Sequence, residues 1–462
     1  MGVLRARALV CGAVLLLAAP VRSTEPALSP EALRLQQYLR VDTRNPPGGE
    51  HQAAALLQGF LAAEGIDAKL FVTPEGRTNL WAELPASESP ATAERIVLLH
   101  HMDVVEPGPG WSVEPFAGTL KEGRVYGRGA LDAKSLGIAE LSALVALKRS
   151  GARLRRGVVL LATADEETGG GAGSAFLWRE HPELFERVVA VLNEGGNNRR
   201  IGQRLLWWGI EVAQKRPLWL EVSTSGRPGH ASGLQPQSAT HLLIQALDRL
   251  LSMPRRWRVS DAARLYLESV APYHNEHWRQ IFTHIDASIA PEGPRTDLLP
   301  GMANLFLDSA QITVLRSGEG INSIPAEATA RVDIRLLPDT DAAEFLAAVR
   351  AALGKEATAR VLLESPPATP SPSDNAVFAA LKDVLGGEAP VVPTFIAGFT
   401  DSRYFREHGV PAYGISPFAL DGEEQRGIHA PDESIPLAEF DRGVERMRRI
   451  VAALASEAAA AR

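Results

Sequence analysis

The sequence predicts an α/β fold in which a smaller α+β sandwich is inserted into a domain with a largely parallel sheet. Two continuous apolar runs, at 95–100 and 157–163, are typical of buried parallel strands because helical segments separate them. Two later segments, at 218–223 and 328–336, alternate apolar with polar side chains, which is typical of a sheet with one wet face. After a Pro-rich stretch at 365–373 the α/β pattern resumes, so the chain returns to its first domain.

Residues 1–23 have the layout of a signal peptide. Arg5 and Arg7 precede an apolar run over 8–19, and small residues follow up to Ser23. The run is shorter than the roughly 20 apolar residues that cross a bilayer, so a permanent membrane helix is the weaker interpretation. We therefore expect export, periplasmic or secreted, with no stable membrane insertion after cleavage. Cys11 is the only cysteine and lies in this leader, so the mature chain has no disulfide.

The first domain is expected over residues 30–215 and 366–462. Its first part contains predicted helices at 30–39, 49–65 and 135–149, where Gly151 ends the third, and a further strand at 188–192. Its second part contains predicted strands at 391–396 and 412–415 and a closing helix at 437–455.

The inserted domain is expected over residues 216–365. Between and after its two alternating strands we expect a helix, a strand, a helix and a strand, at 238–250, 311–315, 341–353 and 360–364. The resulting order of strand, helix, strand, strand, helix, strand is that of a small α+β sandwich. Residues 254–308 form a longer, mostly helical insertion inside it.

Bulk composition limits the partners of the chain. Its 462 residues suffice for two or three domains at roughly one per 150 residues, and 45% of them are hydrophobic, as in globular proteins. The formal net charge of -7 argues against nucleic acid and anionic membranes, because both bind basic surfaces. A small-molecule or peptide substrate fits better.

Candidate metal ligands follow the predicted strands, where open α/β sheets place their sites. They are two histidines and three carboxylates: His101, Asp132, Glu167, Glu194 and His429. Each alone has a simpler interpretation, such as a strand-end histidine, a helix cap or a solvated acidic turn. Together they suit a pair of zinc ions with one bridging carboxylate, for which cobalt or manganese are possible substitutes. Glu166 is then placed to act as a general base on the attacking water.

This combined pattern resembles the zinc exopeptidase and deacylase family that includes carboxypeptidase S, glutamate carboxypeptidase, aminoacylase and acetylornithine deacetylase. The segments Trp111-Ser112-Val113-Glu114-Pro115-Phe116 and Asn193-Glu194-Gly195-Gly196 are most similar to the carboxypeptidase S and N-acyl-amino-acid hydrolase branch. The resemblance covers nearly the whole chain after the leader.

The resemblance implies roles for particular residues. One zinc would be held by His101, Asp132 and Glu194, and the other by Asp132, Glu167 and His429, so that Asp132 bridges them. Glu166 would be the general base and later the acid, and Asp103 would orient the ring of His101. His230 would reach the active site of a neighbouring subunit. Asn322 and Arg335 would contact the carbonyl and carboxylate of the substrate, although by spacing alone Arg335 would pair with Asp333 or with a neighbouring strand on a solvated sheet face.

The implied activity is metal-dependent hydrolysis of the amide bond next to a free carboxylate, in peptides or N-acyl amino acids. The first domain would be the catalytic zinc domain and the inserted one a lid or dimerisation domain of a homodimer. Two alternatives stay open: a dedicated deacylase of one small acylated amino acid, and a non-catalytic relative that binds metal or peptide. Glu166 argues against the latter, because binding alone needs no base.

Overall fold

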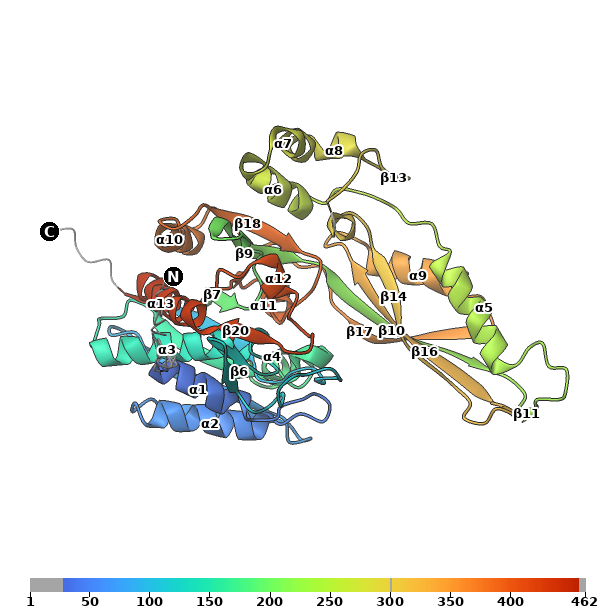
Figure 1. Cartoon of the computed structure of the whole chain (residues 1–462), viewed down its shortest axis with the longest axis horizontal. Helices are drawn as coiled ribbons and strands as arrows, with labels where there is room; N and C mark the ends of the chain where they lie inside the picture. Colours follow the sequence, from blue (N-terminus) through green and yellow to red (C-terminus); the bar gives the residue numbers. More distant parts are fainter. Residues whose placement is uncertain (1–27, 300, 457–462) are drawn as a thin grey trace, which may run out of the picture.

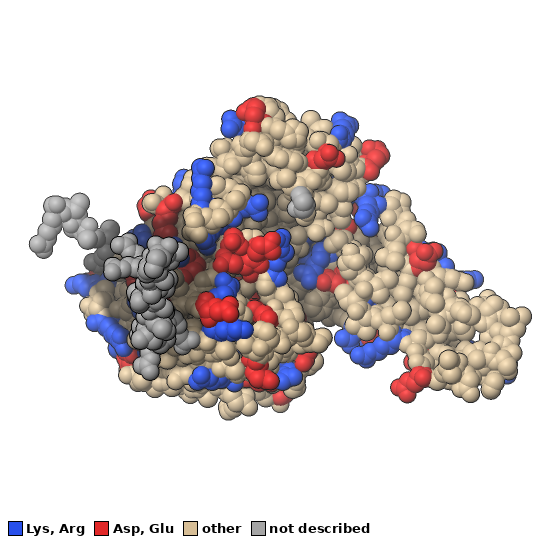
Figure 2. All heavy atoms as spheres, in the orientation of Figure 1, with Lys and Arg blue, Asp and Glu red and all other residues tan. Residues whose placement is uncertain are grey.

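The computed structural model describes residues 28–299 and 301–456. Figure 1 shows a larger body, in which helices lie on both sides of a sheet, and an elongated smaller body. Figure 2 shows acidic and basic side chains interspersed on the face in view. The leader expected over residues 1–23 lies outside the described residues. Within the described segments, no helix has both the length and the apolar character needed to cross a bilayer.

The larger body is built on a nine-stranded sheet in the order β1-β2-β6-β3-β7-β19-β9-β18, with β8 paired to β9. Its parallel centre contains β6 (Gly157–Thr163), β3 (Arg95–His101), β7 (Val188–Asn193) and β19 (Ala412–Gly414). Beyond β6, β2 (Thr78–Leu84) and β1 (Ala68–Val72) are antiparallel. On the other side, β9 (Arg204–Gln214) is antiparallel to β19 and parallel to β18 (Val391–Ile396), and β8 spans Arg199–Ile201.

Side chains of β3 show why both faces of this sheet are covered. Ile96 and Leu98 belong to one hydrophobic cluster, and Val97 and Leu99 belong to another. Successive side chains of a strand point to opposite faces, so each face needs its own helices. The first cluster includes α1 (Pro30–Leu39), α2 (Glu50–Ala62), α3 (Lys134–Ser150), α10 (Ala376–Leu385) and α13 (Leu437–Ala455); the second includes α4 (Ser174–Glu180) and α11 (Ser402–Glu407).

The smaller body is a four-stranded antiparallel sheet in the order β14-β16-β10-β17. Leu218, Leu220 and Val222 of its central strand β10 are fully buried under helices, whereas the intervening Trp219 and Glu221 are half-buried on the other face. The elements are β10 (Arg216–Ser225), α5 (Ala239–Leu251), β14 (Ser309–Ser317), β16 (Glu327–Leu336), α9 (Ala342–Leu353) and β17 (Ala357–Glu364). The predicted fold class, a largely parallel α/β sheet with an α+β sandwich, is confirmed.

The chain passes between the two sheets almost without a break. β9 ends at Gln214 and β10 begins at Arg216, so only Lys215 separates a strand of the large sheet from a strand of the small one. Strand β9 was not among the predicted elements. No Gly-rich or Pro-rich turn divides it from β10, so the sequence marks no boundary between the two strands.

The insertion at 254–308 is mostly helical, as predicted, with α6 (Asp261–Val270), α7 (Glu276–Thr283) and α8 (Ile285–Ser288) and a short ladder of β12 (Ile289–Ala290) and β13 (Gly293–Pro294). Its helices do not extend the core of the small sheet. They share a hydrophobic cluster with Trp207 of β9 and with Val392 and Phe395 of β18. The insertion therefore covers the outermost strand of the large sheet, β18, and its neighbour β9.

Candidate metal centre

The five candidate ligands lie at a strand end or on loops, at the edge of the large sheet where its parallel strands end. His101 ends β3, Glu194 directly follows β7, and Glu167 lies in the short turn after β6. Asp132 precedes α3, and His429 lies between α12 (Gly422–Gln425) and β20 (Ser434–Pro436). The carboxyl ends of parallel strands meet at one edge of a sheet, so residues far apart in sequence converge there.

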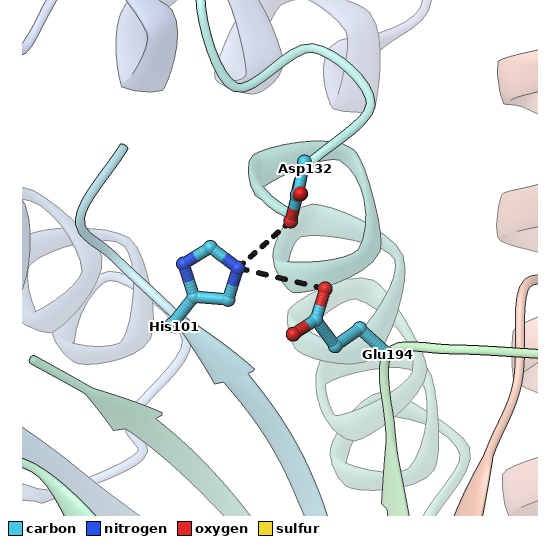
Figure 3. Close-up of side chains that lie close together, drawn as sticks. All are labelled: His101, Asp132 and Glu194. Carbon is cyan, nitrogen blue, oxygen red and sulfur yellow. Dashed lines mark hydrogen bonds and ion pairs between the residues drawn. The ribbon is translucent and has the colours of Figure 1, made fainter. Parts of the chain in front are cut away.

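His101, Asp132 and Glu194 form a first triad (Figure 3). His101 Nε2 lies 2.9 Å from Asp132 Oδ1 and 3.6 Å from Glu194 Oε2. The ligand atoms of the three residues all lie within 4.8 Å of one another. One divalent cation can therefore contact all three.

Asp132, Glu167 and His429 form a second triad. His429 Nε2 lies 3.2 Å from Asp132 Oδ2 and 3.3 Å from Glu167 Oε1. Asp132 thus turns its Oδ1 toward the first triad and its Oδ2 toward the second. This is the arrangement required of a carboxylate that bridges two cations.

The cluster concentrates negative charge in a buried place. Burial, together with the charge of Asp132, raises the pKa of Glu194 to about 8, and burial also raises the pKa of Glu167. Hydrogen bonds to Asp132 and Glu167 raise the pKa of His429 to about 10. Protons therefore balance the carboxylates in the metal-free cluster, and divalent cations would supply the same positive charge. A donor set of imidazoles and carboxylates fits zinc.

Asp103 connects two loops of the cluster. His101 Nδ1 lies 2.9 Å from the backbone carbonyl oxygen of Asp103 and 3.6 Å from its carboxylate. A carbonyl only accepts, so Nδ1 donates to it and Nε2 is left to face the cluster. The carboxylate of Asp103 accepts the backbone N–H of Glu166 at 3.1 Å and of Glu167 at 3.2 Å. The main chain of Asp103 is therefore nearer to the His101 ring, and its side chain fixes the Glu166–Glu167 turn.

Glu166 lies beside the triads and has a free oxygen. Its side chain is buried, and among the described residues its Oε1 has no hydrogen-bond partner. Burial, followed by the charge of Glu194, raises the pKa of Glu166 well above its usual range. Burial of a carboxylate oxygen without a hydrogen-bond partner costs free energy. Such a group therefore indicates a site where a ligand or a proton binds.

A cleft of about 690 Å³ leads from the metal centre to the exposed face of the small sheet, and Asp132, Glu166, Glu194, Trp219 and Arg335 are among its lining residues. Arg335 Nε and Nη2 donate to the two carboxylate oxygens of Asp333, each at 2.7 Å. The guanidinium carbon also lies 4.3 Å from the ring centre of Phe399. The Asp333 pair expected from spacing alone is thus present, and it holds Arg335 in the wall of the cleft.

His230 and Asn322 lie far from this cleft. The short strands β11 (Gly229–His230) and β15 (Ser323–Ile324) pair, and the Ala231 N–H donates to the Asn322 carbonyl at 3.0 Å. Figure 1 places β11 at the end of the smaller body that points away from the large sheet. Both side chains are exposed, and neither lines the cleft of its own chain. The structure therefore separates Asn322 from Arg335, although the resemblance pairs them.

Most of the chain matches a known protein family. Residues 97–453 match Peptidase family M20/M25/M40. The chain belongs to this family. The family resemblance stated from the sequence motifs is thereby confirmed, and the chain belongs to a family of hydrolases.

Relatives within the M20/M25/M40 family agree with this assignment. Human aminoacylase-1 is 28% identical over 436 residues, covering 92% of this chain and 96% of the relative. The N-fatty-acyl-amino acid synthase/hydrolase PM20D1 of Xenopus tropicalis is 28% identical over 353 residues, covering 73% and 68%. Among solved structures, the M20 family metallo-carboxypeptidase Sso-CP2 of Sulfolobus solfataricus superposes with a TM-score of 0.70 at 19% identity, covering 92% of this chain and 99% of that chain. The Bacillus subtilis YXEP protein, which superposes with a TM-score of 0.53 at 14% identity and covers 91% of this chain and 97% of that chain, is described as a dinuclear metal binding peptidase of the M20 family. In this chain the two triads offer ligands that could hold metal ions.

Glu433 has a structural role in this M20/M25/M40 chain that was not predicted from the sequence. Its fully buried carboxylate accepts the backbone N–H groups of Gly129 at 3.2 Å, Leu131 at 2.6 Å and Asp132 at 3.2 Å. Arg128 Nη1 also donates to it at 2.6 Å. In the sequence, the only indication of a role for Glu433 is its position four residues after His429. Its burial becomes visible only in the fold. Glu433 joins the His429 loop to the Asp132 loop.

The same loop is anchored by a small sheet. β20 pairs with β5 (Arg124–Tyr126), which pairs with β4 (Thr119–Lys121). This sheet brings the segment that carries His429 and Glu433 next to the segment that precedes Asp132.

Proposed function

We propose that the chain is a two-zinc exopeptidase-type amidohydrolase that cuts the amide bond next to a free carboxylate, in peptides or N-acyl amino acids. The observation that carries this proposal is the orientation of Asp132, whose two oxygens face two different triads. In this role His101 and Glu194 would complete one zinc site, and Glu167 and His429 the other. Cobalt or manganese are possible substitutes for zinc.

Glu166 is the proposed general base. When bound, the two ions polarise the substrate carbonyl and lower the pKa of water. Among residues 28–299 and 301–456, Glu166 Oε1 has no hydrogen-bond partner, and it lies beside the triads, so it is placed to take the proton of the attacking water and to return it to the leaving nitrogen. Burial raises the pKa of the Glu166 carboxyl group, and bound cations would act in the opposite direction.

Arg335 is the proposed reader of the substrate carboxylate. Asp333 occupies its Nε and Nη2 edge, so the donors on Nη1 remain for a ligand in the cleft. The contact with Phe399 keeps the guanidinium in place. A substrate carboxylate bound there would fix which amide bond of the substrate lies at the metal centre and is cut.

His230 and Asn322 enter the proposal through a second copy of the chain. Both are exposed at the tip of the smaller body, away from their own cleft, so they are available to complete the site of a partner. We therefore propose a homodimer joined through residues 216–365, with the catalytic zinc domain over 30–215 and 366–462. Export after removal of residues 1–23 is also part of the proposal.

A dedicated deacylase is the second candidate function. It is supported by the similarity to aminoacylase-1 along 92% of this chain. It differs from the first candidate in having one small acylated amino acid as its substrate.

The test combines metal counting with an activity panel of dipeptides and N-acyl amino acids. Zinc-loaded protein should bind two ions and hydrolyse substrates in the panel, and chelation should abolish this. Asp132→Asn should lose both ions, His429→Ala should lose one, and Asp67→Asn, at an exposed aspartate, should lose neither. Full metal content in Asp132→Asn would contradict the bridging role, and an inactive zinc-loaded protein would contradict the enzyme.

A further inference from the structure

A second hollow opens at the metal centre, and most of its lining residues differ from those of the cleft. It has a volume of about 180 Å³. It shares Asp132, Glu194 and Ile428 with the cleft, so both spaces meet at the metal centre. A substrate whose scissile bond lies at the metal centre can therefore extend into both.

The lining of this hollow is mainly apolar. Leu131 directly precedes Asp132, and Leu136 lies in the first turn of α3; Ile415, Phe418 and Leu420 come from the segment after β19. Four of these five side chains are at most 6% exposed, so the wall is packed into the core. Within the described part of the chain, the lining includes no lysine or arginine, and its only acids are Asp132 and Glu194.

The polar side chains of the lining are used by the protein itself. Asn198 Nδ2 donates to the carbonyls of Ser416 at 2.8 Å and Phe418 at 3.1 Å. Gln425 Nε2 donates to the carbonyls of Asn198 at 3.2 Å and Leu420 at 2.9 Å. These hydrogen bonds hold the wall in place, and they occupy the side-chain amide nitrogens of Asn198 and Gln425. The hollow therefore offers contact area and little polar recognition.

The position of Arg335 decides which part of a substrate enters the hollow. Arg335 lies in the cleft, and the proposed function assigns it the free carboxylate. With the carboxylate in the cleft and the scissile carbonyl at the metal centre, the remaining acyl part must extend into the hollow. We propose that this hollow is an acyl pocket, which makes the preferred substrates amino acids that carry a short or medium apolar N-acyl group. This inference rests on the proposed amide hydrolysis.

The pocket selects against free peptides because of charge. A dipeptide places an α-ammonium group next to the scissile carbonyl, where Asp132 and Glu194 are already assigned to metal. A buried cation without a partner is strongly unfavourable. An apolar acyl group instead leaves water and fills the pocket. An apolar cavity of about 150 Å³ holds one benzene molecule, so this pocket suits groups of about that size.

The first test compares two substrates that differ only in the ammonium group. These are 4-methylpentanoyl and leucyl derivatives, joined in turn to alanine, leucine and phenylalanine. We expect kcat/KM of the zinc-loaded enzyme to be at least about tenfold higher for each 4-methylpentanoyl compound. Equal or higher kcat/KM for the leucyl compounds would overturn the inference.

The second test varies acyl length from acetyl to dodecanoyl on the same amino acid. We expect kcat/KM to rise about fourfold per methylene, from about 0.8 kcal/mol per buried CH₂, until the pocket is full. Ser416→Leu, which adds bulk to the wall, should shift the optimum to shorter chains, and Leu420→Ala should shift it to longer ones. Leu33→Ala is the matched control, because that leucine is 48% exposed on α1 and lies outside both spaces.

The outcomes separate the two proposals. Hydrolysis with a length profile that neither pocket variant shifts would overturn the acyl pocket and leave the proposed function in place. If only one variant folds, as judged by circular dichroism, the shift of its optimum still decides. If no amide in either series is hydrolysed by the zinc-loaded protein, the proposed function itself fails.

Discussion

The buried carboxylate of Glu433 accepts the backbone N–H of Asp132 at 3.2 Å and so fixes the residue that both triads share. In Glu433→Gln an amide NH₂ group would face these backbone donors, and Arg128 would lose its buried ion pair. Removal of a residue that orients a ligand typically lowers metal affinity about 10-fold to 100-fold, and we expect a loss of zinc affinity in that range. Zinc titration followed by competition with a chelator measures it.

The control for this variant is Glu439→Gln. Glu439 is also buried and pairs with Arg446 at 2.7 Å, but it lies on α13 away from the triads. Both variants should lower the melting temperature, and only Glu433→Gln should weaken zinc binding. Equal zinc affinities in the two variants would show that Glu433 acts on stability alone.

Glu166→Gln should separate metal binding from turnover. The two triads do not include Glu166, so the variant should still bind two ions. Loss of a general base lowers the rate by about 100-fold to 10,000-fold, and kcat should fall by a factor in that range. Steady-state kinetics on protein of measured zinc content checks this. Wild-type rates at full occupancy would rule out the proposed base.

Zinc affinity should rise with pH. In the metal-free protein the pKa of Glu194 is raised to about 8 and that of His429 to about 10, so both groups carry protons at neutral pH. Zinc must displace these protons, and it competes better as their concentration falls. We therefore expect affinity to increase from pH 6 to about 10 with net proton release, and more steeply below about pH 8, where both groups carry protons. Calorimetry in buffers of different ionisation enthalpy measures the protons, and pH-independent binding would contradict the raised values.

Mixing two inactive variants tests the role of His230 in a partner subunit. His230→Ala has an intact Glu166, and Glu166→Gln has an intact His230. If subunits exchange and His230 acts across the interface, each mixed dimer has one complete site, so activity should reappear. Sedimentation measured alongside reports the oligomeric state. A monomeric active enzyme would contradict the proposal.

Arg335→Ala should affect free-acid substrates more than their C-terminal amides. Loss of one partner of a buried charged contact costs about 2 to 5 kcal/mol, which equals a decrease in kcat/KM of roughly 30-fold to several thousand-fold. The amides already lack the carboxylate, so they should lose little more. Arg335→Lys keeps the charge without the planar pair of donors and should be only partly active. Equal losses on acids and amides would show that Arg335 does not read the carboxylate.

Much of the fold was predictable because local patterns mark it. The uninterrupted run of β6 and the amphipathic α13 have the bounds expected from the sequence. Burial on both faces makes a strand apolar throughout, and a helix on the surface of a core repeats its apolar residues every three or four positions. The convergence of His101 and His429 was predictable for another reason, since strand order places loop ends at one edge of the sheet.

Other features depend on contacts that a single sequence does not reveal. The helices of the insertion have apolar faces, but nothing in their pattern distinguishes Val392 and Phe395 of the large sheet from the small sheet as their partner. The acidic run Glu423–Glu424 and the single Glu433 look alike in sequence, yet only Glu433 is buried on backbone donors. Asn322 and Arg335 are far apart because Arg335 lies near the end of β16, whereas Asn322 lies beyond the start of that strand, at the hairpin tip formed by β11 and β15.

The distribution of the ligands along the chain also fixes an order of events during synthesis. His101, Asp132 and Glu194 have all been made when the growing chain reaches residue 194. His429 emerges more than two hundred residues later, together with Glu433, which fixes the Asp132 loop. A nascent chain that has passed residue 194 therefore contains every ligand of the first triad and lacks one of the second. The shared carboxylate can face two complete triads only after residue 429 has been made.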